Sequence, residues 1–196
     1  MTNRELLFFL LKALSLFLVF LILINFISPV LSQFLAKAVD AVMTGLFPRF
    51  IQSIALKNNY LEVVTFFAVA GDPKGQLAFD INPLKYMYGF PLFIALTFSV
   101  KGNLSDKVWH IFIAYFITLI AQIWGVCFDI TRHLLFEFNG VYAGYFEFSS
   151  LQKTLVSLGS QLGFLLLPSL VPILLWSILE NKALKSLVGK NIEIAE

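Results

Sequence analysis

Cysteine and histidine are nearly absent from this sequence, which has one cysteine, Cys127, and two histidines, His110 and His133. A single cysteine excludes an internal disulfide and a cysteine-only metal site within one chain. If residues 108–133 form one helix, the two histidines lie near its opposite ends, roughly 34 Å apart at 1.5 Å per residue. They therefore cannot share a metal ion while that helix is unbroken, and we expect no metal and no other cofactor.

Charge is also scarce, because charged residues make up 13% of the 196 residues against roughly 25% in an average soluble domain. The formal net charge of +2 is small, and no basic stripe interleaves with aromatic residues, so we expect no nucleic-acid partner. The sequence also lacks a glycine-rich loop between a strand and a helix and has no Ser-His-Asp arrangement. These absences exclude P-loop and Rossmann chemistry.

Apolar residues are abundant, at 59% of the chain with 22 phenylalanines. One small soluble core could not bury them, because a domain of this size still exposes about a third of its unfolded-chain surface. Lipid as the surrounding solvent resolves the problem. We therefore predict a mainly α membrane protein with the lipid bilayer as its first partner.

Four stretches are long and apolar enough to be transmembrane helices, and they cover residues 1–28, 83–100, 108–133 and 151–179. The first is longer than a usual signal-peptide core and no small-x-small cleavage site follows closely, so we expect it to be uncleaved. Pro29 should end that helix. Pro168 and Pro172 should kink the last one.

Residues 29–82 connect the first two predicted spans. Residues 30–47 show a helical period, with apolar Leu31, Phe34, Leu35, Ala38, Val42 and Leu46 opposite polar residues, so an amphipathic helix lies there, either on the membrane or on the segment that follows. Strand-like runs at 50–56, 61–69 and 76–81 alternate with turns and predict an antiparallel β-meander. The meander must be extracytoplasmic or otherwise outside the hydrocarbon, because an open sheet edge in lipid leaves backbone groups unpaired.

Residues 134–150 are too polar and too rich in glycine to span, and we predict an aromatic interfacial segment. The interfacial aromatic residues of the chain are predicted to be Tyr86, Tyr88, Tyr142, Tyr145, Phe146 and Phe148. Lys and Arg near the span ends place both termini, including a tail at 180–196, in the cytoplasm and the meander outside.

One side of the 108–133 helix carries a polar stripe of Gln122, Asp129, Arg132 and His133. Asp129 can pair with Arg132 or His133 one turn away, which gives either a structural ion pair or a binding pocket that faces the meander. Small residues four apart (Ala121 with Gly125, and Gly159 with Gly163) predict close helix packing in lipid, where Gln161 could hydrogen-bond to Gln122.

Three phrases together resemble one family: residues 75–92 (GQLAFDINPLKYMYGFPL), 122–129 (QIWGVCFD) and 159–168 (GSQLGFLLLP) with Val171 and Pro172. They are similar to the exosortase H-associated small membrane proteins found beside exosortases in Gram-negative bacteria, over about residues 61–176. The resemblance implies an inner-membrane accessory to an enzyme that sorts and processes exported, C-terminally tagged proteins. It implies no catalytic residues.

Three functions remain in view. The leading expectation is a non-catalytic accessory or scaffold subunit whose partner is an exosortase-like membrane protein or an exported substrate. A thiol-dependent intramembrane peptidase or transpeptidase would use Cys127 as its nucleophile, but on an unbroken helix Cys127 lies about 140° or more from the Asp129–Arg132 stripe. A small transporter or channel would need more polar residues at mid-membrane than Thr118, Gln122 and Gln161.

Overall fold

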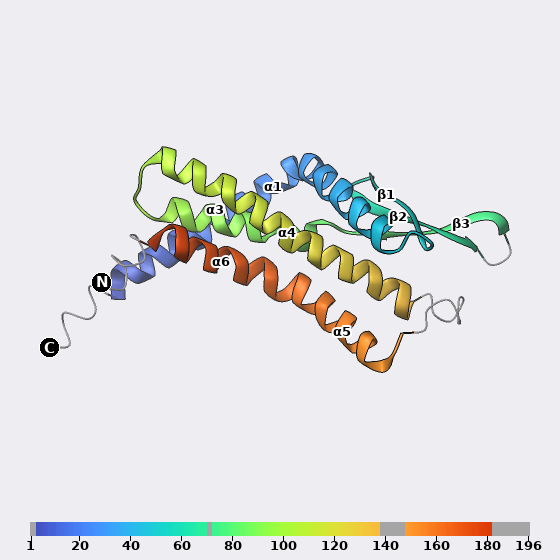
Figure 1. The fold of residues 1–196 in the computed structure, drawn as a ribbon. Coiled ribbons are helices and arrows are strands. Elements are labelled where there is room, and N and C mark those ends of the chain that lie inside the picture. The colour runs from blue at the N-terminus through green and yellow to red at the C-terminus, as the bar shows by residue number, and fades with distance from the viewer. Residues whose placement is uncertain (1–2, 70–71, 138–147, 182–196) are drawn as a thin grey trace. The chain divides into compact units, whose positions relative to one another are not determined.

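The computed structural model describes residues 3–69, 72–137 and 148–181 (Figure 1). The chain forms two compact units. The first unit is Met1–Phe26, Met87–Thr118 and Pro168–Glu196, and the second is Ile27–Tyr86 and Leu119–Leu167. Because three long helical segments contribute residues to both units, each unit is built from stretches that are far apart in the sequence.

Helix α1 runs from Asn3 to Leu46 with Pro29 in its interior. The prediction that Ser28 and Pro29 end the first helix is therefore wrong. A proline removes one N–H from the helical ladder, but helices of membrane proteins tolerate it where neighbouring groups satisfy the freed carbonyl. The predicted transmembrane helix and the predicted amphipathic helix are one continuous element.

Three helical segments are long and apolar enough to cross a membrane: Arg4–Leu46, Leu104–Phe136 and Ser150–Leu179. The predicted second span, residues 83–100, is instead two shorter helices, α2 (Leu84–Met87) and α3 (Gly89–Ser99). The 11 residues of α3 extend about 16 Å at 1.5 Å per residue, which is short of a hydrocarbon core of about 30 Å. The described residues thus contain three helices that are long and apolar enough to cross a membrane, and the predicted count of four is not confirmed.

The last long segment consists of α5 (Ser150–Gln161), a π-helical turn η1 (Leu162–Leu166) and α6 (Leu167–Leu179). Ser149 begins it with a reciprocal capping box, in which Ser149 Oγ accepts from the N–H of Gln152 and the Gln152 side chain accepts from the N–H of Ser149. The kink expected at Pro168 and Pro172 stays a prediction: Pro168 directly follows the first residue of α6, after the π turn, and Pro172 lies inside α6. Pro168 has no N–H to close the normal ladder, and the wider turn lets Leu167 N–H bond to the Leu162 carbonyl.

The β-meander is present as three antiparallel strands in the order β1-β2-β3. The strands are β1 (Ile51–Lys57), β2 (Tyr60–Val69) and β3 (Asp72–Ile81). Asn58 and Asn59 join β1 to β2 with φ angles of 50° and 66°, the left-handed conformation that a two-residue hairpin turn requires and that asparagine tolerates. In the same unit the N–H of Ile54 donates to Asp40 Oδ1 at 2.7 Å, which ties β1 to the second half of α1.

The apolar face predicted for residues 30–47 is divided between buried and exposed side chains in the second unit. Leu35 is buried, whereas Phe34, Val42 and Leu46 are exposed. The buried side chains are Ser32, Leu35, Ala36, Val39 and Met43. An apolar helix in lipid can expose one apolar face and bury another, so the contrast between apolar and polar positions does not identify the packed face.

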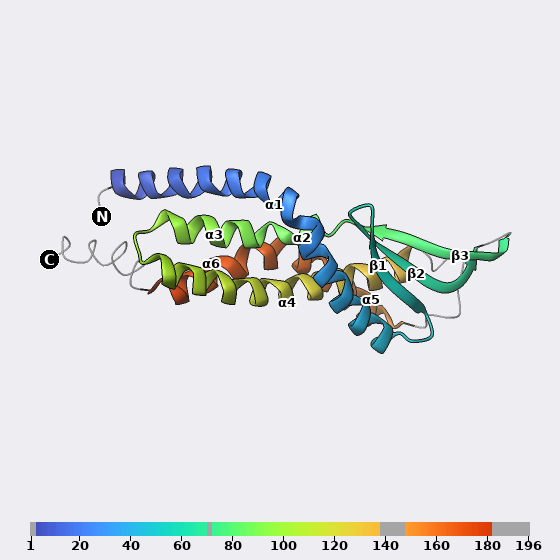
Figure 2. The ribbon, with the colours of Figure 1, turned by 90° about the horizontal axis from the view of Figure 1, so that it is seen from above.

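The first unit has an apolar core of Phe93, Val100, Ala114, Leu175 and Trp176. Figures 1 and 2 show α3 running alongside the first half of α4 (Leu104–Phe136) and α6. At the C-terminal end of α3, Lys107 Nζ donates to the Val100 carbonyl at 2.6 Å and Lys12 Nζ to the Ser99 carbonyl at 3.3 Å. Ammonium groups at this end satisfy carbonyls that the helix leaves unpaired.

Candidate functional site

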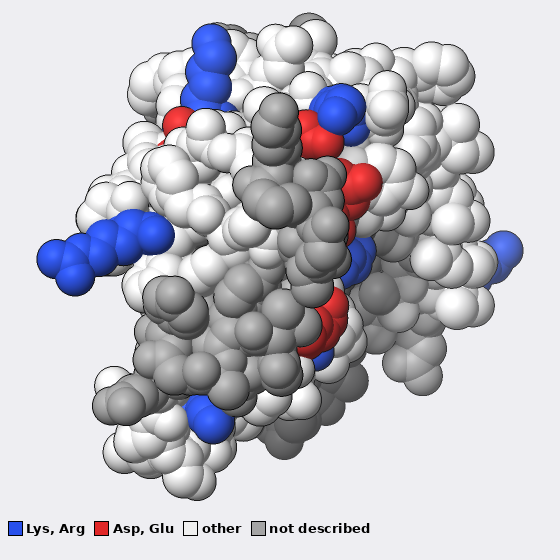
Figure 3. Space-filling model, turned by 90° about the vertical axis from the view of Figure 1, so that its right-hand side faces the viewer, with Lys and Arg blue, Asp and Glu red and all other residues white. Residues whose placement is uncertain are grey.

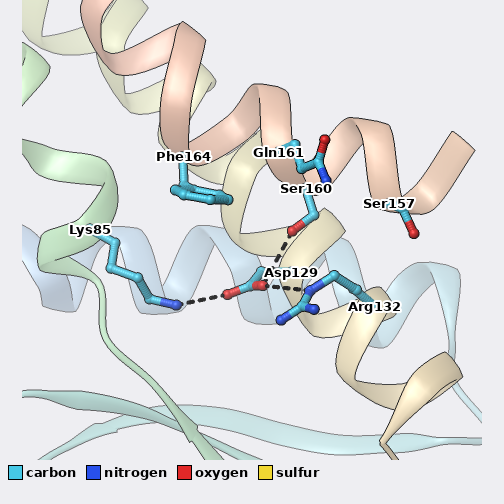
Figure 4. Close-up of a pocket in the computed structure, with 7 residues that line it drawn as sticks. All are labelled: Lys85, Asp129, Arg132, Ser157, Ser160, Gln161 and Phe164. Carbon is cyan, nitrogen blue, oxygen red and sulfur yellow. Dashed lines mark hydrogen bonds and ion pairs between the residues drawn. The ribbon is translucent and has the colours of Figure 1, made fainter.

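Asp129 is a buried carboxylate in the second unit, and its side chain is 4% exposed. Lys85 Nζ lies 3.2 Å from Oδ2, and the Tyr86 hydroxyl donates to the same oxygen at 2.7 Å. On the other oxygen, Oδ1, Arg132 Nε donates at 3.4 Å and Ser160 Oγ at 3.3 Å. A buried charge is tolerated when it is paired and hydrogen-bonded, and this one has partners on both oxygens (Figure 4).

Three elements bring these partners together. Arg132 lies one turn after Asp129 on α4, and Ser160 belongs to α5. Lys85 and Tyr86 belong to the short helix α2, where Asn82 Oδ1 accepts from the N–H of Leu84 at 3.0 Å and fixes the start of the helix. Figure 4 shows Lys85 and Arg132 approaching Asp129 from opposite sides.

Tyr86 was predicted to be an interfacial aromatic residue, and its side chain is buried within the second unit. Tyr86 is 1% exposed and its hydroxyl donates to Asp129. Lys85, Tyr86 and Ser160 were missed as partners of Asp129 because they are distant from it in sequence. The one available signal was Lys85 itself, a positive charge at a span end where the predicted orientation had no role for it.

The predicted stripe is partly assembled. Arg132 contacts Asp129, while His133 Nε2 is 3.9 Å from Asp129 Oδ1 and its Nδ1 is 2.7 Å from Glu137 Oε2. The His133 ring also lies against Phe79 of β3, with centroids 5.5 Å apart. Gln122 is buried two turns earlier on α4 but does not line the pocket described below.

The small residues predicted to mediate helix packing do make close contacts in the second unit. A Cβ added to Gly163 would clash with the Cα of Gly125, and one added to Gly125 would lie 2.9 Å from the Gly163 carbonyl oxygen. A Cβ on Gly159 would clash with the Phe128 ring. Ala121 is half-buried, and Gln161 faces the pocket (Figure 4), so within the described ranges no hydrogen bond joins Gln161 to Gln122.

A pocket of about 320 Å³ opens beside the carboxylate. It is lined by Lys85, Asp129, Arg132, Ser157, Ser160, Gln161 and Phe164 (Figure 4). The two cationic side chains are 45% and 40% exposed, whereas that of Asp129 is 4% exposed. The carboxylate thus lies beneath the surface, and the cations face the opening.

None of the other candidate residues that the structure describes lines this pocket, apart from Gln161. Cys127 is half-buried on α4 and is not among the lining residues. Tyr88 is half-buried in the first unit, and Phe148 is half-buried just before α5. Tyr142, Tyr145 and Phe146 lie outside the described residues, as do residues 138–147 of the predicted aromatic segment and 182–196 of the tail. Within the described part of the chain, no group of three or more His, Cys, Asp or Glu side chains could hold a metal ion.

The family model for exosortase H-associated membrane proteins matches residues 3–183. The chain belongs to this family. The match extends the resemblance seen in the three short motifs across α1 at one end and to the end of α6 at the other. No curated protein and no solved structure matches the chain.

Membership of this family and the three long apolar helices agree that this exosortase H-associated protein is a membrane protein. Large apolar side chains are exposed along all three helices, among them Phe8, Phe26, Trp109, Ile120 and Ile178. In water such surfaces would drive aggregation, and in lipid they contact acyl chains.

On the face drawn in Figure 3, Lys and Arg side chains alternate with Asp and Glu among uncharged residues, so the described residues form no continuous basic area there.

Proposed function

We propose that this protein is a non-catalytic accessory subunit of an exosortase-type sorting system in the bacterial inner membrane. The observation that carries the proposal is the family match over residues 3–183. An accessory role is supported by the chemistry of the polar site around Asp129: the carboxylate has partners on both oxygens, Ser160 donates to Asp129 rather than to His133, and Cys127 does not line the pocket. In this proposal the function of the protein is to bind a membrane partner.

The partner surface in this proposal is the extracytoplasmic meander together with the segment at 134–150. The exposed side of β2 includes Tyr60 and Phe66, which are 45% and 55% exposed. Aromatic residues are enriched in the buried centres of protein interfaces. An exosortase-like membrane protein or its exported substrate would cover these side chains.

The proposed topology places both termini in the cytoplasm and therefore needs an even number of crossings. The three long helices provide three, so α2 and α3 together must supply the fourth. Residues 84–99 would extend about 24 Å if helical throughout, which requires the bilayer to thin by several ångströms or flanking residues to reach the interface. Single-cysteine variants in a Cys127→Ala background test this, with residues of the β1–β2 turn expected to react with impermeant reagents from the periplasmic side.

Co-purification is the direct test of the accessory role. A tagged full-length chain, expressed with its neighbouring exosortase and solubilised in a mild detergent, is expected to retain the second membrane protein. Double substitution of Tyr60 and Phe66 by Ser should weaken retention at least ten-fold, while a matched double substitution of the lipid-facing Phe8 and Ile22 should not. A lone monomer whose deletion leaves protein sorting intact would contradict the proposal.

The thiol enzyme is separated from the accessory role by one substitution. Cys127→Ala is expected to leave protein sorting at the wild-type level, because Cys127 does not line the polar pocket. A loss of sorting with normal protein abundance would instead favour a nucleophilic role for this thiol.

A further inference from the structure

The pocket beside Asp129 keeps hydrogen-bond donors that the carboxylate does not use. Arg132 binds Asp129 through Nε, and the nearest other carboxylate oxygen, on Glu137, is 4.0 Å from Nη2. Lys85 has Asp129 as its one acceptor within the described residues. In the same part of the chain, the hydroxyl of Ser157 and the amide of Gln161 make no hydrogen bond, although both line the pocket. Donors from α2, α4 and α5 therefore converge on one cavity.

The charges at the pocket do not cancel. Asp129 neutralises one of the two cations that flank it, and it lies beneath them. Glu137 is outside the lining and lies 4.0 Å from Arg132 Nη2. The residues that line the pocket therefore carry one more formal positive charge than negative, and the buried carboxylate holds the two cations beside it.

We propose that this pocket binds the phosphate group of a membrane lipid. A phosphate presents acceptor oxygens in several directions, which suits a guanidinium, an ammonium, a hydroxyl and an amide arranged around one cavity. Basic pockets between membrane helices are a recurrent form of lipid headgroup recognition. The volume of about 320 Å³ accommodates a phosphate with a small alcohol headgroup.

The position of the pocket along the helices favours a lipid over a phosphate free in water. Arg132 is four residues from the end of α4 at Phe136, and Lys85 lies in the short helix α2. The end of a membrane-capable helix is where headgroups are found. On the other side, Phe164 lines the pocket, and Leu165 and Leu166 continue an exposed apolar surface along the same helix, where acyl chains can lie.

The test is lipid binding by the purified full-length chain in detergent, without any partner protein, so its outcome is independent of the proposed accessory role. Native mass spectrometry is used to compare phosphatidylglycerol, a diacylglycerol with the same acyl chains, and inorganic phosphate. We expect phosphatidylglycerol to bind at least ten-fold more tightly than either of the other two. Equal binding of diacylglycerol, or equally tight binding of inorganic phosphate, would overturn a lipid-phosphate site.

Two variants locate the binding. Arg132→Gln removes the guanidinium and is paired with Arg49→Gln, which removes an exposed arginine of the same unit. Ser157→Leu fills the pocket while leaving every Asp129 partner in place, and it is paired with Thr154→Leu on the exposed side of α5. Each pocket variant should weaken phosphatidylglycerol binding about ten-fold and each control should not. If Arg132→Gln does not fold, Ser157→Leu decides, and wild-type binding by Ser157→Leu would refute the proposal.

Discussion

The two units differ in what fills their interiors. The first unit packs aromatic and aliphatic side chains around Phe93 and Trp176, and its buried ammonium group, Lys107, binds a backbone carbonyl. The second unit instead buries a carboxylate with polar partners from three elements and brings Gly125 against Gly163. Both units draw on the same long helices, so the difference lies in the inward-facing residues and not in the overall hydropathy of the helices.

This contrast shows two ways of packing helices within one small membrane protein. Lipid is as apolar as a leucine side chain, so burying apolar surface between helices gains little, and fit and polar bonds decide the packing. In the first unit the fit of large side chains serves that purpose. In the second unit, polar bonds hold the helices, and those bonds also leave charged groups at a pocket.

Loss of the buried carboxylate should have the largest effect. Asp129→Ala leaves the buried hydroxyls of Tyr86 and Ser160 without their acceptor and brings two cations together without their counter-ion. We expect the free energy of unfolding to fall by about 3 kcal/mol, since breaking a buried charge pair strands its partners. Thermal unfolding in detergent measures this, with Asp106→Ala in the exposed first turn of the same helix as the control.

A comparable loss from Asp106→Ala would contradict the assignment of Asp129 as the centre of the second unit. An Asp129→Asn variant sharpens the result. The amide keeps the shape of the side chain and can still accept from Tyr86, but it no longer neutralises Lys85 and Arg132. The free energy of unfolding of Asp129→Asn should therefore lie between those of the wild type and Asp129→Ala.

Close backbone contacts occur in both units, and alanine substitutions test whether they are equally tight. A Cβ on Gly163 would clash with Gly125 in the second unit, and one on Gly89 would clash with the Pro168 carbonyl in the first. Each Gly→Ala change should cost about 2 kcal/mol, because backbone atoms cannot move aside without shifting a helix. Gly45, near the end of α1, has no atom within 4 Å of an added Cβ, so Gly45→Ala should be neutral or stabilising.

These contacts mark the limit of what the sequence could predict. Periodic strands and the glycines four apart identified the meander and the packing surfaces, because both depend on local spacing. The partners of Asp129 did not follow, since Lys85 and Ser160 are 44 and 31 residues away along the chain. Such contacts depend on how the chain returns on itself, which local patterns do not encode.

The helix boundaries show a second limit. Pro29 was expected to end α1 and instead lies inside it, whereas the break between α2 and α3 falls at Tyr88 and leaves Pro91 in the first turn of the 11-residue helix α3. Proline removes one N–H at both places, but in a first turn that N–H has no helical partner to lose. Whether the helix continues depends on the groups that surround the gap, and these come from distant parts of the chain.

The cation in the first unit should matter less than the carboxylate in the second. Lys107 is 7% exposed and donates to the Val100 carbonyl at 2.6 Å. Lys107→Met keeps much of the apolar stem but removes the donor, so the unfolding free energy should drop by about 1.5 kcal/mol. The control is Lys101→Met in the exposed loop before α4, and an equal loss in that variant would remove the distinction between the two lysines.

The exposed ion pair on the meander should have the smallest effect of all. Lys57 Nζ lies 2.6 Å from Glu62 Oε1. The hydrogen bond to Glu62, reinforced by its negative charge, raises the pKa of Lys57 above its ordinary value of 10.5. A raised pKa means that any stabilisation is present below the unfolded pKa and is lost as the pH rises through the higher folded value, so at pH 7 it is fully present.

The Lys57 side chain is nevertheless 63% exposed, and water and salt screen such a pair until little remains. Lys57→Gln should therefore leave the unfolding midpoint unchanged at pH 7 and at pH 9. A drop as large as that of Asp129→Ala would show that burial is not what distinguishes the two carboxylates, and the contrast between a polar interior and a polar surface in the second unit would be lost.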